Sequence, residues 1–302
     1  MFNPFPGLRP FTTSESHLFF GREGQSEEVL SNLSQNRFVA VVGSSGSGKS
    51  SLMYCGVVPI LYGGFITEAG SKWKIILSRP GNDPIGNLAK EIAARSGEDN
   101  SDNGYNPKLI RAILESSSNG LVEAIKQTQS QDDQNYLILA DQFEELFRFR
   151  KKFGNENAVN ESFAYVRLIM NAIKQSDVPI YVVMTMRSDF IGECAQYQEL
   201  TDMINTSHYL IPQMNRDNFK LAIKGPIAVG GGKISEKLVN ELLNDLGDNP
   251  DQLPILQHAL MRTWDFWMKH SGGKEELDVV HYDSIGRMEK ALSNHANEAF
   301  NE

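Results

Sequence analysis

The sequence of 302 residues contains only two cysteines, Cys55 and Cys194, and no cluster of cysteine and histidine at the spacing of metal ligands. This scarcity argues against a disulfide framework and a structural zinc site, so we expect two buried free thiols. Apolar runs such as FVAVV and YVVM are far shorter than the ~18 residues of a membrane span. The first residues, MFNPFPGLRPF, lack the basic and apolar stretches of a signal peptide. We therefore expect a soluble, cytoplasmic protein without a membrane partner.

Positive charge is also in short supply. Lysine and arginine total 29 against 38 aspartates and glutamates, which gives a net charge of −9. Phosphate backbones repel such a surplus, so this chain is not expected to bind nucleic acid non-specifically. The sequence is 40% hydrophobic, which suffices for a sizeable core, and its length suggests two domains.

Short apolar runs alternate with helical patterns over the first two thirds of the chain. This alternation predicts an α/β fold with a parallel sheet that is covered on both faces. The predicted strands are 37–43, 73–78, 136–140 and 179–186, with a weaker one near 210. One predicted helix begins near Ser26, and a second, SLMYCGVV, ends before Pro59. Three more are predicted over 84–96, 107–117 and 119–129.

Strand patterns stop after Pro212, and only helical ones follow, over 215–224, 234–246 and 252–269. We therefore expect an α/β core over 1–212, which includes an extended N-terminal segment, and a helical domain over 213–280. The amphipathic stretch 281–302 is interpreted as the start of a further domain.

The segment GSSGSGKS, residues 43–50, fits the pattern G-x-x-x-x-G-K-[ST] and lies where a strand gives way to a helix. Glycines let successive backbone N–H groups point at phosphate oxygens beside the positive end of the helix dipole. Lys49 would add a charge between the β- and γ-phosphates, and the Ser50 hydroxyl would ligate Mg²⁺. The predicted phosphate-binding residues are Gly43, Ser44, Ser45, Gly46, Ser47, Gly48, Lys49, Ser50 and Ser51.

A nucleotide-bound magnesium ion also needs a carboxylate at the end of a neighbouring strand. In YLILADQFEEL, Asp141 occupies that place. Glu144 and Glu145 follow, and either could orient and deprotonate the attacking water; the alternative is a solvated first turn of a helix. Gln142 cannot serve as a base.

Arg187 closes the fourth predicted strand in MTMRSDF. A guanidinium there could sense the γ-phosphate and stabilise charge in the transition state. The alternative is an ion pair with Asp189 or Glu193.

These motifs together resemble the STAND class of signalling NTPases. They are NPFPGLRPF, FFGRE, RFVAVVGSSGSGKSSL, ADQFEELF, MTMRSDF and LPILQHALMRTW. The pattern is most similar to the bacterial novel STAND group, whose members are often fused to WD-repeat propellers or effector domains. The resemblance runs from about residue 3 to 300 and relates the chain to the NACHT and NB-ARC proteins.

The resemblance implies a sheet order of 5-1-4-3-2, as in AAA+ proteins, and favours Glu145 as the base, with Glu144 near Mg²⁺. It places Phe20, Gly21 and Arg22 against adenine, although Phe20 could instead be a hydrophobic anchor.

The resemblance also places Pro254 in a lid that caps the base, although this proline could simply begin a helix. A winged-helix domain would start near residue 281, and neither His281 nor His295 is given its nucleotide-sensing role.

The resemblance implies a switch that binds ATP or ADP with Mg²⁺, hydrolyses ATP slowly, and couples nucleotide state to self-association and to a fused or recruited effector. Family members act in bacterial defence and cell-fate signalling. The alternatives are an AAA+ remodelling or DNA-loading ATPase and a scaffold without turnover. The first would need an arginine finger, for which Arg79 and Arg262 are candidates by position only; the alternative for each is a solvated surface residue. A GTPase is disfavoured because no N-K-x-D follows the fourth strand, and HSGGK at 270–274 departs from the LSGGQ of ABC proteins.

Overall fold

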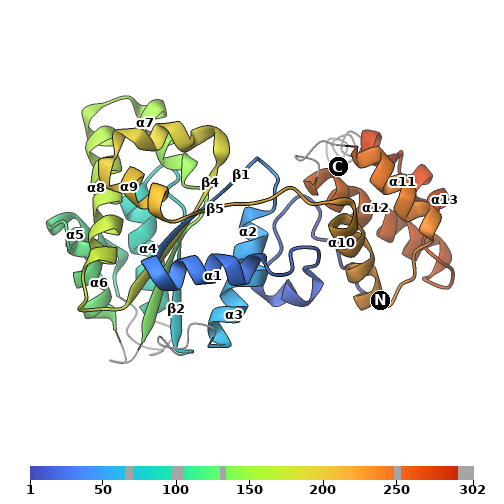
Figure 1. The fold of residues 1–302 in the computed structure, drawn as a ribbon, viewed down its shortest axis with the longest axis horizontal. Coiled ribbons are helices and arrows are strands. Elements are labelled where there is room, and N and C mark those ends of the chain that lie inside the picture. Colours follow the sequence, from blue (N-terminus) through green and yellow to red (C-terminus); the bar gives the residue numbers. More distant parts are fainter. Residues whose placement is uncertain (65–70, 97–104, 130–133, 248–252, 292–302) are drawn as a thin grey trace. The chain divides into compact units, whose positions relative to one another are not determined.

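The computed structural model describes residues 1–64, 71–96, 105–129, 134–247 and 253–291 (Figure 1). The chain forms two compact units. The sheet unit comprises Glu27–Gly43 and Ile60–Ile211, and the helical unit comprises Met1–Ser26, Ser44–Pro59 and Pro212–Glu302. The predicted division at residues 212 and 280 concerns functional domains and stays a prediction.

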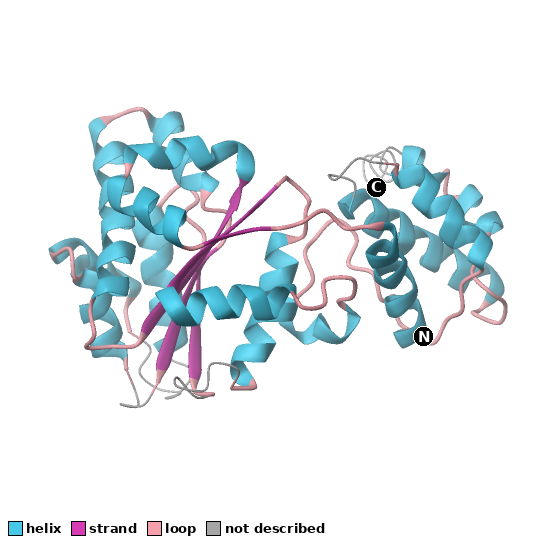
Figure 2. Ribbon diagram, in the orientation of Figure 1, coloured by secondary structure: helices cyan, strands magenta, loops and turns pink. Residues whose placement is uncertain are grey.

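The sheet unit is built on five parallel strands in the order β2-β3-β4-β1-β5 (Figure 2). Read from the other edge, this is the predicted order 5-1-4-3-2, which is therefore confirmed. The strands are β1 (Phe38–Gly43), β2 (Trp73–Ser78), β3 (Asn135–Ala140), β4 (Ile180–Arg187) and β5 (His208–Leu210).

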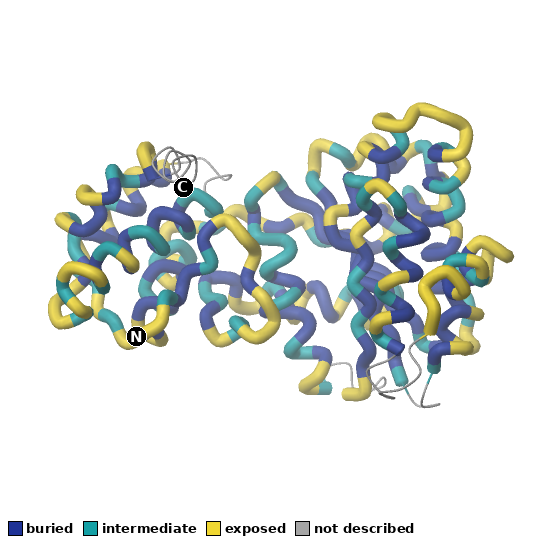
Figure 3. The backbone as a smooth tube through the Cα atoms, turned by 180° about the vertical axis from the view of Figure 1, so that it is seen from behind, coloured by how far each residue is buried: buried dark blue, intermediate teal, exposed yellow. Residues whose placement is uncertain are grey.

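Both faces of the sheet are buried, as expected of parallel strands. All six residues of β1 and of β3 are buried, whereas the short edge strand β5 is partly exposed; Figure 3 shows buried parts of the chain in dark blue. On one face, even-numbered residues such as Ala40, Ile138 and Val182 join the apolar core formed with the flanking helices. Because residues on both faces of these strands are buried, apolar side chains occupy consecutive positions, which explains the continuous apolar runs of the sequence.

Three helices of the sheet unit follow the sequence pattern closely, whereas α8, η3 and α9 were not predicted. The predicted helices 84–96, 107–117 and 119–129 correspond to α4, α5 and α6, with ends that differ by at most one residue. The helices are α1 (Gln25–Asn36), α4 (Pro84–Ser96), α5 (Pro107–Ser116), α6 (Gly120–Thr128), α7 (Glu144–Phe153), α8 (Glu156–Lys174), the 3₁₀ helix η3 (Ser188–Gln196) and α9 (Gln198–Thr206).

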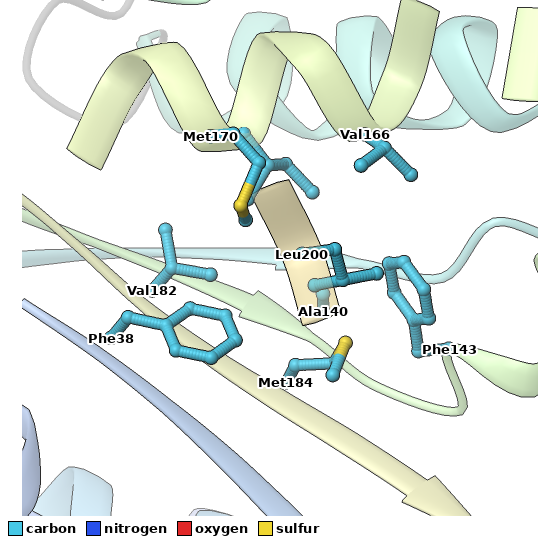
Figure 4. A pocket seen from close by; sticks show the side chains of 9 residues that line it. Phe38, Ala140, Phe143, Val166, Met170, Val182, Met184 and Leu200 are labelled. Atoms are coloured by element: carbon cyan, nitrogen blue, oxygen red, sulfur yellow. The ribbon is translucent and has the colours of Figure 1, made fainter. Parts of the chain in front are cut away.

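A small hollow between the sheet and helices α8 and α9 is part of this core (Figure 4). Its lining is entirely apolar and comes from β1, β3, β4, α8 and α9, with Phe143 at one end. It offers no polar group to a ligand, so we assign it to packing.

The helical unit has its own core. Trp264 and Trp267 are fully buried and meet edge to face, with ring centroids 4.9 Å apart, and Phe5 of the N-terminal segment packs into the same core. The elements are η1 (Thr13–Leu18), α2 (Lys49–Ser51), the π helix η2 (Leu52–Val57), α3 (Val58–Tyr62, which runs past the unit's edge), α10 (Arg216–Val229), α11 (Glu236–Leu246), α12 (Leu253–Ser271) and α13 (Val279–Ser284).

The helix after the phosphate loop does not end before Pro59, so that prediction was wrong. It continues through a π-helical stretch, in which the Val58 N–H donates to the Met53 carbonyl five residues earlier, and on to Tyr62. Pro59 then stands in the first turn of α3, where a missing N–H costs little because the helical register has just changed.

The N-terminal segment is packed against the rest of its unit at two places. Phe11 and Leu18 are buried beside Cys55 of η2. Near the chain start, the Asn3 amide donates to the Met261 carbonyl at 3.0 Å and to the Asp265 carboxylate at 2.8 Å. One segment therefore contacts both the helix after the phosphate loop and α12.

Both cysteines are free and buried, as predicted. Burial raises the pKa of the Cys55 and Cys194 thiols to about 12. Within the described residues, none of the helices has the length and apolarity that crossing a membrane requires.

The stretch interpreted as the start of a further domain is only partly described. His281 is buried in α13, where its Nδ1 accepts from the Asp278 N–H at 3.0 Å as part of a helix N-cap. His295 lies outside the described residues. His281 thus has a structural role within the helical unit.

We predict that Gly225→Ala destabilises the helical unit. An alanine Cβ at Gly225 in α10 would lie 2.5 Å from ring atoms of Phe20, so the ring or the helix must shift. We expect a loss of about 1–3 kcal/mol in the free energy of unfolding, although alanine in a helix interior ordinarily gains about 0.5–1 kcal/mol over glycine. Urea unfolding measures the change.

The control is Gly192→Ala in η3, where an added Cβ meets nothing within 4 Å. A double-mutant cycle isolates the contact: in a Phe20→Ala background, Gly225→Ala should no longer destabilise the protein. Equal losses in both backgrounds would contradict the proposed clash.

Candidate functional site

The phosphate loop lies between β1 and α2, with the backbone its glycines predict. Gly46 and Gly48 have φ values of 69° and 86°, in the left-handed region that glycine adopts without a steric penalty. Gly48 is the N-cap residue of α2, and Lys49 opens that helix. Gly43 ends β1, so the loop begins at the carboxyl end of a central strand, as nucleotide-binding loops do.

The Lys49 side chain lies along its own loop. Its Nζ donates to the Ser44 carbonyl at 2.6 Å and approaches the Ser47 hydroxyl at 3.4 Å. The ammonium is thus held beside the segment whose N–H groups are expected to bind phosphate. Ser51, another predicted binding residue, accepts a hydrogen bond from the Phe11 N–H at 3.2 Å through its hydroxyl.

Arg22 ties the phosphate loop to distant parts of the helical unit. Its side chain is buried, and its guanidinium donates to the Ser47 carbonyl at 2.8 Å and to the Pro212 carbonyl at 2.7 Å. A third bond, at 3.2 Å, reaches the Gln25 side chain. These contacts make Arg22 a residue that positions the loop, a role the sequence pattern did not indicate.

The other residues expected near the base also belong to the helical unit. Phe20 and Gly21 pack against α10: a Cβ on Gly21 would come within 2.4 Å of the Asn218 carbonyl oxygen, and Gly225 faces the Phe20 ring. The hydrophobic-anchor interpretation of Phe20 thus has a structural basis, and a contact with adenine stays a prediction. Pro254 lies in the first turn of α12.

The predicted catalytic residues lie at the carboxyl edge of the sheet. In the parallel register, Gly43 of β1 is opposite Arg187 of β4, and Ala140 of β3 is opposite Met184. The ends of β1, β3 and β4 therefore lie at one edge, and Asp141 follows directly after β3.

Asp141 is fully buried and held from both sides. The Thr185 hydroxyl of β4 donates to its Oδ1 at 2.7 Å. From the other side, the Arg79 guanidinium donates to its Oδ2 through Nη2 at 2.8 Å and Nε at 3.1 Å. Hydrogen bonds to an ionised group in a low-dielectric site are strong, so the carboxylate is fixed in position.

The two glutamates begin helix α7, and both accept backbone N–H groups. Glu144 is buried and accepts from the Arg187 N–H at 3.3 Å, whereas Glu145 is half-buried and accepts from the Gly81 N–H at 3.1 Å. Glu144 is therefore not part of a solvated helical turn. Which of the two is the base stays a prediction.

Gln142, next to Asp141, adopts a left-handed backbone with a φ of 56°. Glycine adopts that conformation more easily than a residue with a side chain. The Gln142 side chain is exposed, and its N–H donates to the Thr185 hydroxyl at 3.0 Å. The turn therefore forms without glycine.

Arg187 forms a bidentate ion pair with Asp189, at 3.0 Å and 2.8 Å. This pairing lowers the pKa of the Asp189 carboxyl below its usual value. The predicted alternative of an ion pair with Asp189 thus describes the present structure, and a role toward phosphate stays a prediction.

Sequence reasoning missed two contributors to this edge. Thr185 is the polar residue inside the otherwise apolar strand IYVVMTM, a signal that could have been used. From the sequence, Arg79 is a candidate arginine finger toward another subunit or a solvated surface residue, whereas in the structure it pairs with Asp141 of its own chain. Its place one residue after β2, the neighbour of β3, was the available signal.

Comparisons with known proteins bear on the family and the fold of this chain. Residues 4–302 match the family described as Novel STAND NTPase 1. No curated protein matches the chain.

Several solved structures share the fold. The ORC2 protein of Aeropyrum pernix, in ADPNP–ADP complexes, is similar at 14% identity and a TM-score of 0.58, over 90% of this chain and 68% of that one. The ORC1 protein of the same organism, in complex with DNA, gives 12% and 0.57, over 88% and 64%. A Walker-type ATPase of Pyrococcus abyssi gives 13% and 0.53, over 97% and 75%. At these identities the likeness concerns the fold alone.

We predict that Thr185→Val lowers stability, because it leaves one oxygen of a buried carboxylate and one backbone N–H without their hydroxyl partner. The expected loss is about 1–3 kcal/mol in the free energy of unfolding, measured by urea titration.

Thr185→Ser is the matched control, because it keeps the hydroxyl and removes one methyl group, at a cost of about 1 kcal/mol. The loss from Thr185→Val should also shrink in an Asp141→Asn background. Equal losses for valine and serine would show that the hydroxyl is unimportant.

Proposed function

Because the chain belongs to the Novel STAND NTPase 1 family, we propose that it is a nucleotide-operated switch that binds ATP with Mg²⁺, hydrolyses it slowly, and couples nucleotide state to self-association. Family membership confirms the resemblance drawn from the motifs and makes the chain a P-loop NTPase. The preference for ATP, the slow turnover and the coupling are the proposal.

One observation carries the switch: the phosphate loop is packed into the same unit as the N-terminal segment and helices α10 to α13. Arg22 bonds the loop to Pro212, just before α10, and Ser51 bonds the helix after the loop to Phe11. Phosphate at this loop would act on these contacts directly. A ligand shifts the equilibrium between two conformations only if it binds one of them more tightly. Contacts that link the phosphate loop to other segments can make the affinity for phosphate differ between the conformations.

The donor groups suit magnesium. The Asp141 carboxylate and the Ser50 hydroxyl are oxygen ligands of the kind that this ion prefers, and Asp141 already holds a cation, the Arg79 guanidinium. We propose that Ser50 and Asp141 hold the ion, which when bound would neutralise charge on the phosphates. Glu145, with Glu144 beside it, would hold the attacking water and accept its proton, and Arg187 would stabilise charge on the γ-phosphate.

The finer parts of the proposal rest on the family resemblance. ADP would favour a closed monomer, with Phe20, Gly21, Arg22 and Pro254 around the base, and ATP an open form that assembles and activates a fused or recruited effector. The setting would be the cytoplasm, and the process signal transduction in bacterial defence or cell fate. The division into a core over 1–212, a helical lid over 213–280 and a winged-helix start at 281 belongs to the same proposal.

We predict that Lys49→Ala weakens ATP binding about 10- to 100-fold, because it removes a charge-assisted contact with phosphate. Isothermal titration with ATP and GTP, with and without Mg²⁺, measures affinity and base preference. Lys126→Ala is the control, since it removes only a surface ion pair with Asp177. Unchanged ATP affinity in Lys49→Ala would refute the nucleotide site.

We further predict that Glu145→Gln lowers the ATP hydrolysis rate about 10²- to 10⁴-fold, the usual contribution of a general base, while ATP binding persists. Glu144→Gln should lower the rate less. Light scattering should then find Glu145→Gln with ATP in a larger assembly than with ADP. A monomer in both nucleotides would contradict the coupling, and fast turnover stimulated by DNA would favour the DNA-loading alternative.

A further inference from the structure

The loop between β2 and α4, residues 79–83, contacts two of the predicted catalytic acids at once. Its first residue, Arg79, donates two hydrogen bonds to Oδ2 of Asp141, at 2.8 Å and 3.1 Å. Two residues later, the Gly81 N–H donates to Oε2 of Glu145 at 3.1 Å. The expected metal carboxylate and the favoured base are therefore engaged by one short segment.

Contacts with three helices hold this loop in shape. The Asn87 amide of α4 donates to the Pro80 carbonyl at 3.0 Å, and the Arg111 guanidinium of α5 pairs with Asp83 at 2.8 Å. Lys152 of α7 donates to the Asn82 side chain at 3.2 Å. The position of Arg79 and Gly81 over the acids is thus part of the folded sheet unit.

The electrostatics of the pair are asymmetric. The Asp141 side chain has no exposed surface, whereas the Arg79 side chain is 43% exposed. A buried carboxylate needs a counter-charge, but a partly exposed guanidinium regains hydration when it leaves, so this partner is displaceable. A divalent cation bound to Asp141 would lie close to the positively charged guanidinium on the same carboxylate, and the two positive charges would repel each other.

We propose that Arg79 is a resident counter-ion of Asp141 that competes with magnesium for this carboxylate. The proposal rests on the proposed function and adds one point to it: the carboxylate of Asp141 becomes available to the metal when the cation that accompanies the nucleotide displaces the guanidinium. Without nucleotide, the loop keeps both acids engaged.

The test compares Arg79→Gln and Arg79→Lys with the wild-type chain. The readout is binding of a fluorescent ATP analogue as a function of free Mg²⁺, with thermal unfolding measured in parallel. We expect Arg79→Gln to lower the half-saturating Mg²⁺ concentration about three- to tenfold. Arg79→Lys keeps the charge but loses the two-pronged geometry, so it should lie between. Without nucleotide, Arg79→Gln should melt at a lower temperature and regain stability with Mg²⁺ and nucleotide.

The control is Lys126→Gln, which removes a surface ion pair with Asp177 in the same unit and takes no part in the contacts of the loop. It should leave the Mg²⁺ dependence unchanged.

An unchanged or raised half-saturating Mg²⁺ concentration in both Arg79 variants, with nucleotide binding that still depends on Lys49, would overturn the counter-ion role alone. If Lys49→Ala binds ATP as tightly as the wild-type chain does, the proposed function and this inference are overturned together. Should Arg79→Gln fail to fold, the Arg79→Lys comparison decides the matter by itself.

Discussion

A carboxylate without exposed surface must be neutralised and hydrogen-bonded within the protein, and in this chain that carboxylate is Asp141. The strand order provides both requirements. Because β2 lies beside β3, with Ser78 opposite Ala140, the residue after β2 arrives next to Asp141, and it is Arg79. Because β4 lies on the other side, Thr185 reaches the second oxygen. The order 2-3-4 thus determines which groups surround the acid.

In the helical unit, contacts with other segments hold the glycine-rich phosphate loop in one conformation. The left-handed glycines permit the turn, but they do not enforce it. Arg22 and the hydroxyl of Ser51 fix the loop and its helix by bonds to segments far away in the sequence. The N-terminal segment therefore contacts the helix after the loop through Phe11 and also buries Phe5 in the core of the helical unit.

Much of this architecture follows from the sequence because the signals are local. The apolar strands and the helices α4, α5 and α6 were predicted within a few residues, whereas α8 and α9 were not predicted. The strand order came from the family resemblance. The helix through Pro59 was mispredicted because a π-helical turn upstream depends on packing that a local pattern does not reveal.

The phosphate loop could be read from spacing, but its neighbours could not. Arg79 and Thr185 meet Asp141 only through the sheet register, and Arg22 reaches Ser47 across 25 positions of sequence. The left-handed backbone of Gln142 is likewise unexpected for a residue with a side chain. Such contacts are products of topology, which a single sequence reveals only when its fold is known.

The buried thiols have a practical consequence for studying motion in this protein. Thiol-reactive dyes attack the thiolate, and with pKa values of about 12 Cys55 and Cys194 remain protonated at neutral pH. Cysteines introduced at exposed positions of the two units would therefore take up fluorophores selectively in the native chain. Distances reported by energy transfer between them could then follow the molecule through a nucleotide cycle without removal of either natural cysteine.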